Sequence, residues 1–138
     1  MASPEPDKPH SVAAAIDVVE STYELTLAYA AQGRQAEADD PLGVRDALRR
    51  ADAALDVLAA ATPEQFGAPG GAAAQPTTDM LAVLKRDVAN ARAAIRFVLA
   101  QRTIGSQIID NLNASIHIRA LLTDIFLLDE AFEKTDSA

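Results

Sequence analysis

Few residues of this chain have the types and spacing that metal chemistry requires. His117 follows Asp110 and Asn113 at positions that place all three on one side of a helix. Such a group could in principle coordinate a metal ion. A di-iron helical bundle, however, needs Glu-x-x-His pairs on two helices, and the sequence contains no such pair. Asp124 falls on the same side of the helix. We therefore expect a solvated polar stripe, no metal and no cofactor.

Nucleophilic catalysis is equally unsupported by the sequence. Ser106 or Ser115 would need a base within hydrogen-bond reach and an acid that orients this base. On a helical wheel His117 points away from Ser115 by about 160°. The chain has no Cys, which excludes cysteine nucleophiles and thiolate metal sites. We expect no catalytic residues, and the sequence favours a binding module over an enzyme.

Composition favours one small helical domain. The 138 residues are 49% apolar and rich in Ala, with four Phe and no Trp. A formal charge of −8 repels phosphate backbones, so we expect no nucleic-acid partner. No apolar segment approaches the roughly 20 residues that cross a bilayer, and the start MASPEPDKPHS lacks the apolar core of a signal peptide. We expect an acidic cytoplasmic protein with no membrane partner.

Apolar residues recur at steps of three and four, the spacing of a helix stripe. With N-cap candidates at Ser11, Asp40 and Thr77 or Thr78, this predicts helices over 11–33, 41–61, 77–101 and 104–134. The spacing is typical of an all-α antiparallel four-helix bundle, whose fourth helix is the longest. We expect a single domain over 11–134, disordered tails over 1–10 and 135–138, and a flexible loop over 63–76, which is rich in Gly and Pro.

The third predicted helix carries the chain's only local excess of basic residues, namely Lys85, Arg86, Arg92 and Arg96. These side chains could pair with the acidic first and second helices across the bundle. They could also face water, which is the commoner fate of exposed charge. The sequence leaves both arrangements open.

The last predicted helix changes its apolar direction along its length. Its first half has one drifting row, formed by Ile104, Ile108, Leu112 and Ile116. Its second half has a broad arc, formed by Ile118, Leu121, Leu122, Ile125, Phe126, Leu128 and Phe132, with Leu127 on the far side. A helix with one set of neighbours keeps one stripe, so the drift indicates a bend or a change of neighbour midway.

This breadth motivates the functional hypothesis. An apolar surplus on one helix indicates a contact surface, and two-fold self-pairing is the commonest oligomer geometry. We expect a non-enzymatic protein-binding module, such as an adaptor, chaperone or regulatory protein, that forms a homodimer. The expected interface is Ile118, Leu121, Leu122, Ile125, Phe126 and Leu128. The alternative is a ligand-binding or enzymatic bundle with a cleft near Ile109, Asn113 and His117.

Overall fold

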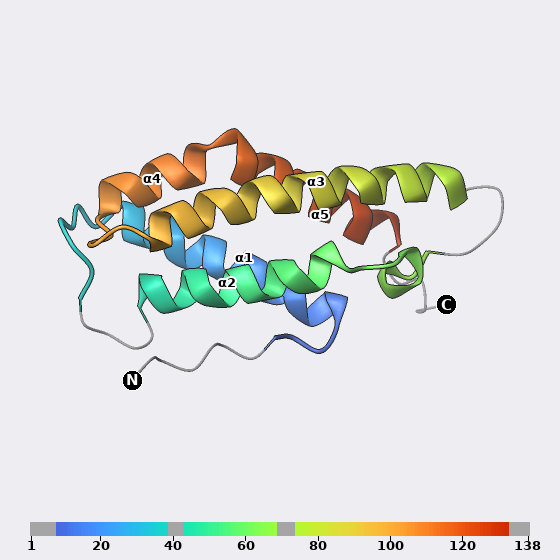
Figure 1. Ribbon diagram of the computed structural model, residues 1–138, viewed down its shortest axis with the longest axis horizontal. Helices are drawn as coiled ribbons and strands as arrows, with labels where there is room; N and C mark the ends of the chain where they lie inside the picture. Colours follow the sequence, from blue (N-terminus) through green and yellow to red (C-terminus); the bar gives the residue numbers. More distant parts are fainter. Residues whose placement is uncertain (1–7, 39–42, 69–73, 133–138) are drawn as a thin grey trace.

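The computed structural model describes residues 8–38, 43–68 and 74–132, and all the regular secondary structure within them is helical (Figure 1). In chain order the elements are α1 (Val12–Ala30), α2 (Val44–Ala59), the 3₁₀ helix η1 (Pro63–Phe66), α3 (Ala74–Leu99), α4 (Ser106–Ala114) and α5 (Ile116–Ala131). The described residues contain no strand. The all-helical prediction is therefore confirmed.

Local signals explain where several elements begin and end. The Ser11 hydroxyl accepts a hydrogen bond of 3.0 Å from Ala14 N–H and so caps α1. Thr62 and Gln65 form a capping box on η1, which ends at Gly67 with a φ of 87°. The segment expected as a loop over 63–76 thus contains η1 and the first residues of α3, while 69–73 lie outside the described residues. The predicted tail over 135–138, and residues 1–7 of the other tail, also lie outside them.

The helices pack around one apolar core. Helix α1 packs against α2 and α4, and α3 packs against α2 and α5. The largest fully buried side chains come from α2 to α5 and from the turn before α4; they are Leu48, Leu55, Leu58, Leu84, Val88, Ile104, Ile109, Leu121 and Ile125. Each helix thereby covers its apolar stripe with neighbouring helices.

The single helix expected over 104–134 was a wrong prediction, because the chain forms two helices there. Ser115 has φ −66° and ψ 148°, an extended conformation that ends α4, and its hydroxyl accepts from Ile118 N–H at 3.3 Å to begin α5. Serine favours such breaks because its side chain offers the backbone a different hydrogen bond. The longest described helix is α3, with 26 residues, and not the last one.

The break coincides with a change of neighbours. Helix α4 packs mainly on α1, whereas α5 packs mainly on α3. The two apolar directions seen in the sequence therefore belong to two helices that cover different parts of the core.

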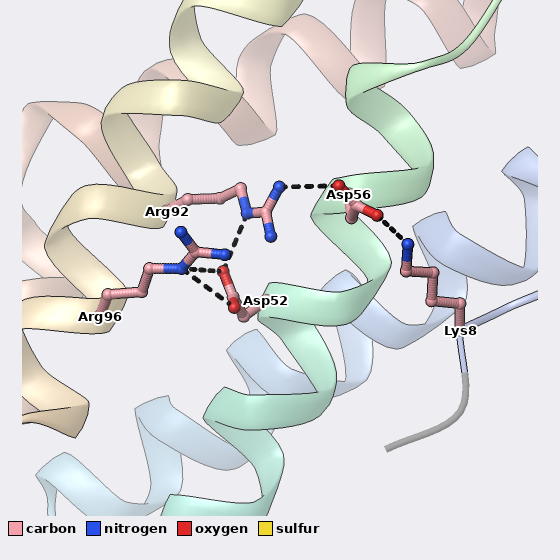
Figure 2. A network of polar contacts seen from close by, with 5 residues as sticks. All are labelled: Lys8, Asp52, Asp56, Arg92 and Arg96. Atoms are coloured by element: carbon pink, nitrogen blue, oxygen red, sulfur yellow. Dashed lines mark hydrogen bonds and ion pairs between the residues drawn. The ribbon is translucent and has the colours of Figure 1, made fainter. Parts of the chain in front are cut away.

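Arginines of α3 pair with α2, as Figure 2 shows. Arg92 donates from Nε to Asp52 at 2.9 Å and from Nη1 to Asp56 at 3.1 Å. Arg96 Nε also lies 3.1 Å from Asp52 Oδ1, and Lys8 pairs with Asp56. Half of the basic group thus bridges two helices, while Lys85 and Arg86 are exposed.

Candidate functional site

The residues of the alternative cleft lie in three different environments. Asn113 is buried, and its Nδ2 donates to the Thr26 carbonyl at 3.0 Å. Ile109 is fully buried, whereas His117 and Asp110 are exposed. Within the described residues, no group of three or more His, Asp or Glu side chains is arranged to hold a metal ion.

A small apolar cavity of about 30 Å³ lies in the core near the α4–α5 break. Its lining includes Thr22, Tyr23, Leu55, Asn113, Ile118 and Leu121. A cavity of this size has room for a group about as large as a water molecule. Of the three residues predicted for a cleft, only Asn113 lines this cavity.

The apolar arc predicted as an interface lies mostly inside the chain's own core. Five of its members are buried, namely Ile118, Leu121, Leu122, Ile125 and Leu128. Phe126, by contrast, is 51% exposed. The arc is broad because α5 fills the space between α3 and the neighbouring helices, so most of it has no surface left for a second molecule.

The opposite side of α5 carries large apolar side chains that remain more than half exposed. Ile116 is 74% exposed and Leu127 is 57% exposed. Together with Phe126 and the exposed residues Arg119, Thr123 and Glu130, they form what we call the outward face of α5. The sequence interpretation had assigned Ile116 to the apolar row of the preceding segment. The signal it overlooked is the regular spacing of residues 119, 123, 126 and 130.

A buried carboxyl group lies on a third side of α5. Asp124 is only 5% exposed, and its Oδ2 has no hydrogen-bond partner among the residues that the structure describes. Burial, together with a hydrogen bond and charge repulsion from Asp87 on α3, raises the pKa of Asp124 to about 7. The sequence had suggested a solvated polar stripe here, since a helical wheel does not reveal that α3 covers this side.

Buried polar groups are hydrogen-bonded to one another where the end of α1 and the segment after it meet the turn before α4. There, Tyr29 OH donates to Ile104 O at 2.6 Å, and Ser106 Oγ donates to Tyr29 O at 2.7 Å. Arg34 and Ser106 also exchange hydrogen bonds of 2.8 Å, from Arg34 N–H to Ser106 Oγ and from Ser106 N–H to Arg34 O. We call this region, together with Glu37, Arg45 and Gly105, the polar corner.

Glu37 and Arg45 complete the polar corner. Glu37 accepts from Ile104 N–H at 2.6 Å and from Arg45 Nε at 2.6 Å. Arg45 also donates to Leu99 O at 2.8 Å and to Gln101 O at 3.1 Å, the carbonyls at the end of α3. Burial opposes ionisation of Glu37, but the hydrogen bonds from Ile104 N–H, its own N–H and Arg45 outweigh it and lower the pKa of Glu37. The polar corner binds chain segments together and uses its donors and acceptors internally.

Comparison with protein-family models, curated proteins and solved structures gave no match. Within the described residues, no helix has the length and apolar character needed to cross a membrane. The role of the outward face of α5 therefore follows from its own chemistry. It combines three exposed apolar side chains with one basic and one acidic residue on a single helix.

Proposed function

We propose that this protein is a non-enzymatic helical protein-binding module, of the adaptor, chaperone or regulatory kind, that binds through the outward face of α5. The observation that carries the proposal is the exposure of Ile116, Phe126 and Leu127 on one helix. Covering an exposed Leu, Ile or Phe contributes about 1.5–3 kcal/mol per side chain before the costs of association. Apolar side chains gathered on one surface mark contact sites more often than isolated ones do.

The other exposed apolar residues of the described chain support this choice by contrast. Leu27 on α1 and Phe97 on α3 are the remaining large apolar side chains that are exposed, and each is the single one on its helix. Isolated exposed apolar residues are normal on soluble proteins. Helix α5 is thus the best-supported contact surface.

The antiparallel arrangement of the helices and the homodimer, both expected from the sequence, are part of the same proposal. We propose that α1, α2, α3 and the α4–α5 pair pack as an antiparallel bundle, and that two such bundles form a homodimer. In this proposal Phe126 keeps its predicted interface role, and Ile116 and Leu127 replace the five buried members of the arc. The cytoplasmic location and the absence of nucleic-acid partners stay predictions from the composition.

Site-specific photo-cross-linking in the source cells tests the proposal. A photoreactive phenylalanine analogue replaces Phe126 in one variant and Phe97, the other strongly exposed Phe, in the control. We expect discrete protein adducts at position 126 and none at position 97. Adducts of equal pattern at both positions, or at position 97 alone, would contradict binding through α5.

A second candidate function is binding of a small ligand in the core cavity beside Asn113. The observation in its favour is the apolar lining of this cavity. Its volume of about 30 Å³ admits only a very small group unless the helices separate. A thermal-shift screen of metabolites and metal ions tests this candidate, because a ligand specific for the native state raises the melting temperature. A Leu55→Phe variant, which fills the cavity, should abolish any such shift.

A further inference from the structure

We propose that the occupant of the outward face of α5 is α5 of a second copy, paired antiparallel about a two-fold axis that passes between Thr123 and Phe126. This inference rests on the proposed function and specifies its partner. It follows from the order of charged and apolar residues along the exposed helix.

The stripe at the centre of the face consists of Arg119, Thr123, Phe126 and Glu130. These residues recur at steps of four, three and four, and all four are exposed. Such spacing keeps them on one line along the helix, as in the seam of a two-stranded coiled coil. The stripe has a basic residue at one end, an acidic residue at the other, and an apolar centre.

An antiparallel pair of these stripes is complementary in charge. The two-fold axis brings Arg119 of one copy opposite Glu130 of the other, and the symmetry produces this pair twice. It also places Phe126 against Thr123 of the second copy. Because the Thr123 hydroxyl already donates to Arg119 O at 2.9 Å, packing of the ring on Thr123 leaves no unpaired donor.

A parallel pair of the same stripes is disfavoured. It would place Arg119 opposite Arg119 and Glu130 opposite Glu130, which are like charges in direct contact. Within the described part of the chain neither side chain forms an ion pair of its own, so both are available to a partner. Charge therefore selects the antiparallel orientation.

Ile116 and Leu127 flank the central stripe on one side. In an antiparallel pair the same flank of each helix faces its counterpart, so Leu127, which lies near the two-fold axis, extends the apolar contact beyond Phe126. In this register the counterpart of Ala131, the last residue of α5, is Ile118, so Ile116 lies just outside the helix pair. In this register residues 118–131 of the two copies of α5 overlap, and at 1.5 Å per residue the contact is about 21 Å long. A single helix pair buries less than the roughly 800 Å² per partner of a standard stable interface. We expect a reversible dimer with a dissociation constant of about 10–500 µM.

Charge-exchange variants test the orientation and register. Arg119→Glu and Glu130→Arg each place like charges opposite one another in a homodimer, and we expect at least about tenfold weaker association for each. An equimolar mixture of the two variants restores both opposite-charge pairs, and only between the different chains. The double variant Arg119→Glu with Glu130→Arg restores them in its own homodimer. Sedimentation equilibrium between about 10 and 500 µM measures all four samples.

Matched controls make the same charge changes at exposed positions outside α5, namely Arg49→Glu on α2 and Glu64→Arg on η1. We expect both controls to associate as the wild type does, and circular dichroism checks that every variant is folded. A wild type that remains monomeric at 500 µM, or single variants that do not recover on mixing, would overturn the antiparallel pairing.

These results separate the inference from the proposed function. A monomeric wild type that still yields adducts with a different protein from position 126 removes self-pairing and leaves a protein-binding module. A monomeric wild type without such adducts removes both. A dimer with restored association on mixing supports both.

Discussion

The polar corner and the outward face of α5 are built on opposite principles. In the polar corner, donors and acceptors from segments about 70 positions apart pair with one another, such as Ile104 N–H with Glu37 at a separation of 67 residues. On the outward face of α5, three large apolar side chains and two opposite charges are exposed, and neither charge forms an ion pair within the described residues. A region whose groups are satisfied internally stabilises the fold, whereas a region with unused groups is available for binding.

Helix α5 and the polar corner also differ in their buried carboxyl groups, because the stabilising contributions of Asp124, on a third side of α5, and of Glu37 respond to pH in opposite directions. Because the pKa of Glu37 is lowered, its stabilising contribution is present above the usual value of 4.5 and is lost as the pH falls. Because the pKa of Asp124 is raised from 3.8 to about 7, the folded state holds a proton that the unfolded chain releases. The contribution of Asp124 is therefore full below pH 4 and is lost as the pH rises to about 7.

The largest effect is expected in the polar corner, from Arg45→Ala. The substitution leaves the largely buried carboxylate of Glu37 without its cation and removes the donors to Leu99 O and Gln101 O. We expect a loss of about 2–4 kcal/mol in the free energy of unfolding, measured by urea titration. The control is Arg49→Ala on the same helix, where the side chain is exposed and we expect a change within about 0.5 kcal/mol. Equal losses in both variants would show that the corner is not a special source of stability.

Gly105→Ala tests how closely the two segments of the corner approach. An added Cβ would lie 2.8 Å from Gln35 O and 2.9 Å from Arg34 O, and both are backbone atoms that cannot rotate away. We expect a loss of about 2–3 kcal/mol in the free energy of unfolding. For comparison, Gly33→Ala meets no atom within 4 Å but adopts a φ of 63°, which costs about 1 kcal/mol. If thermal or urea unfolding shows a larger loss of stability for Gly33→Ala than for Gly105→Ala, the close approach at Gly105 is refuted.

Asp124→Asn tests the buried carboxyl of α5. The amide carries no charge at any pH, so at pH 8 we expect the variant to be more stable than the wild type by about 2 kcal/mol. At pH 4, where Asp124 is protonated in the fold, the difference should largely vanish. Asp87→Asn is the control, because it removes the like charge that helps raise the pKa of Asp124. Asp87→Asn should weaken the pH dependence of the free energy of unfolding above pH 4 without abolishing it. Urea titrations from pH 4 to pH 8 measure these differences. A stability difference between Asp124→Asn and the wild type that does not change with pH would contradict the raised pKa of Asp124.

The smallest effect on stability is expected on the outward face, from Leu127→Ser. The side chain is exposed, so we expect the free energy of unfolding to change by less than about 0.5 kcal/mol. Its loss should nevertheless weaken association, whereas Leu27→Ser, an exposed Leu on α1, should not. Unfolding measured below 5 µM and sedimentation measured near 500 µM separate these two properties. If both variants self-associate as strongly as the wild type does, the outward face has no role in association.

Helical periodicity and end signals were legible in the sequence because they depend on near neighbours. Steps of three and four predicted the helices, and Ser11 was predicted as the cap that it forms at 3.0 Å from Ala14 N–H. The drift of apolar direction before and after Ser115 was also visible. The sequence did not reveal that this drift marks two separate helices, because a helical wheel describes one helix and not its neighbours.

Tertiary structure decided which face of each helix is covered. Ile125 and Phe126 are adjacent and equally apolar, but the packing of α5 on α3 buries the first and leaves the second exposed. The same packing buries Asp124, which the sequence had assigned to a solvated stripe. Glu37 and Ile104 meet only because α1, α3 and α4 bring distant segments together. Periodicity determines that a helix has an apolar side, whereas the relative placement of helices determines which residues remain for a partner.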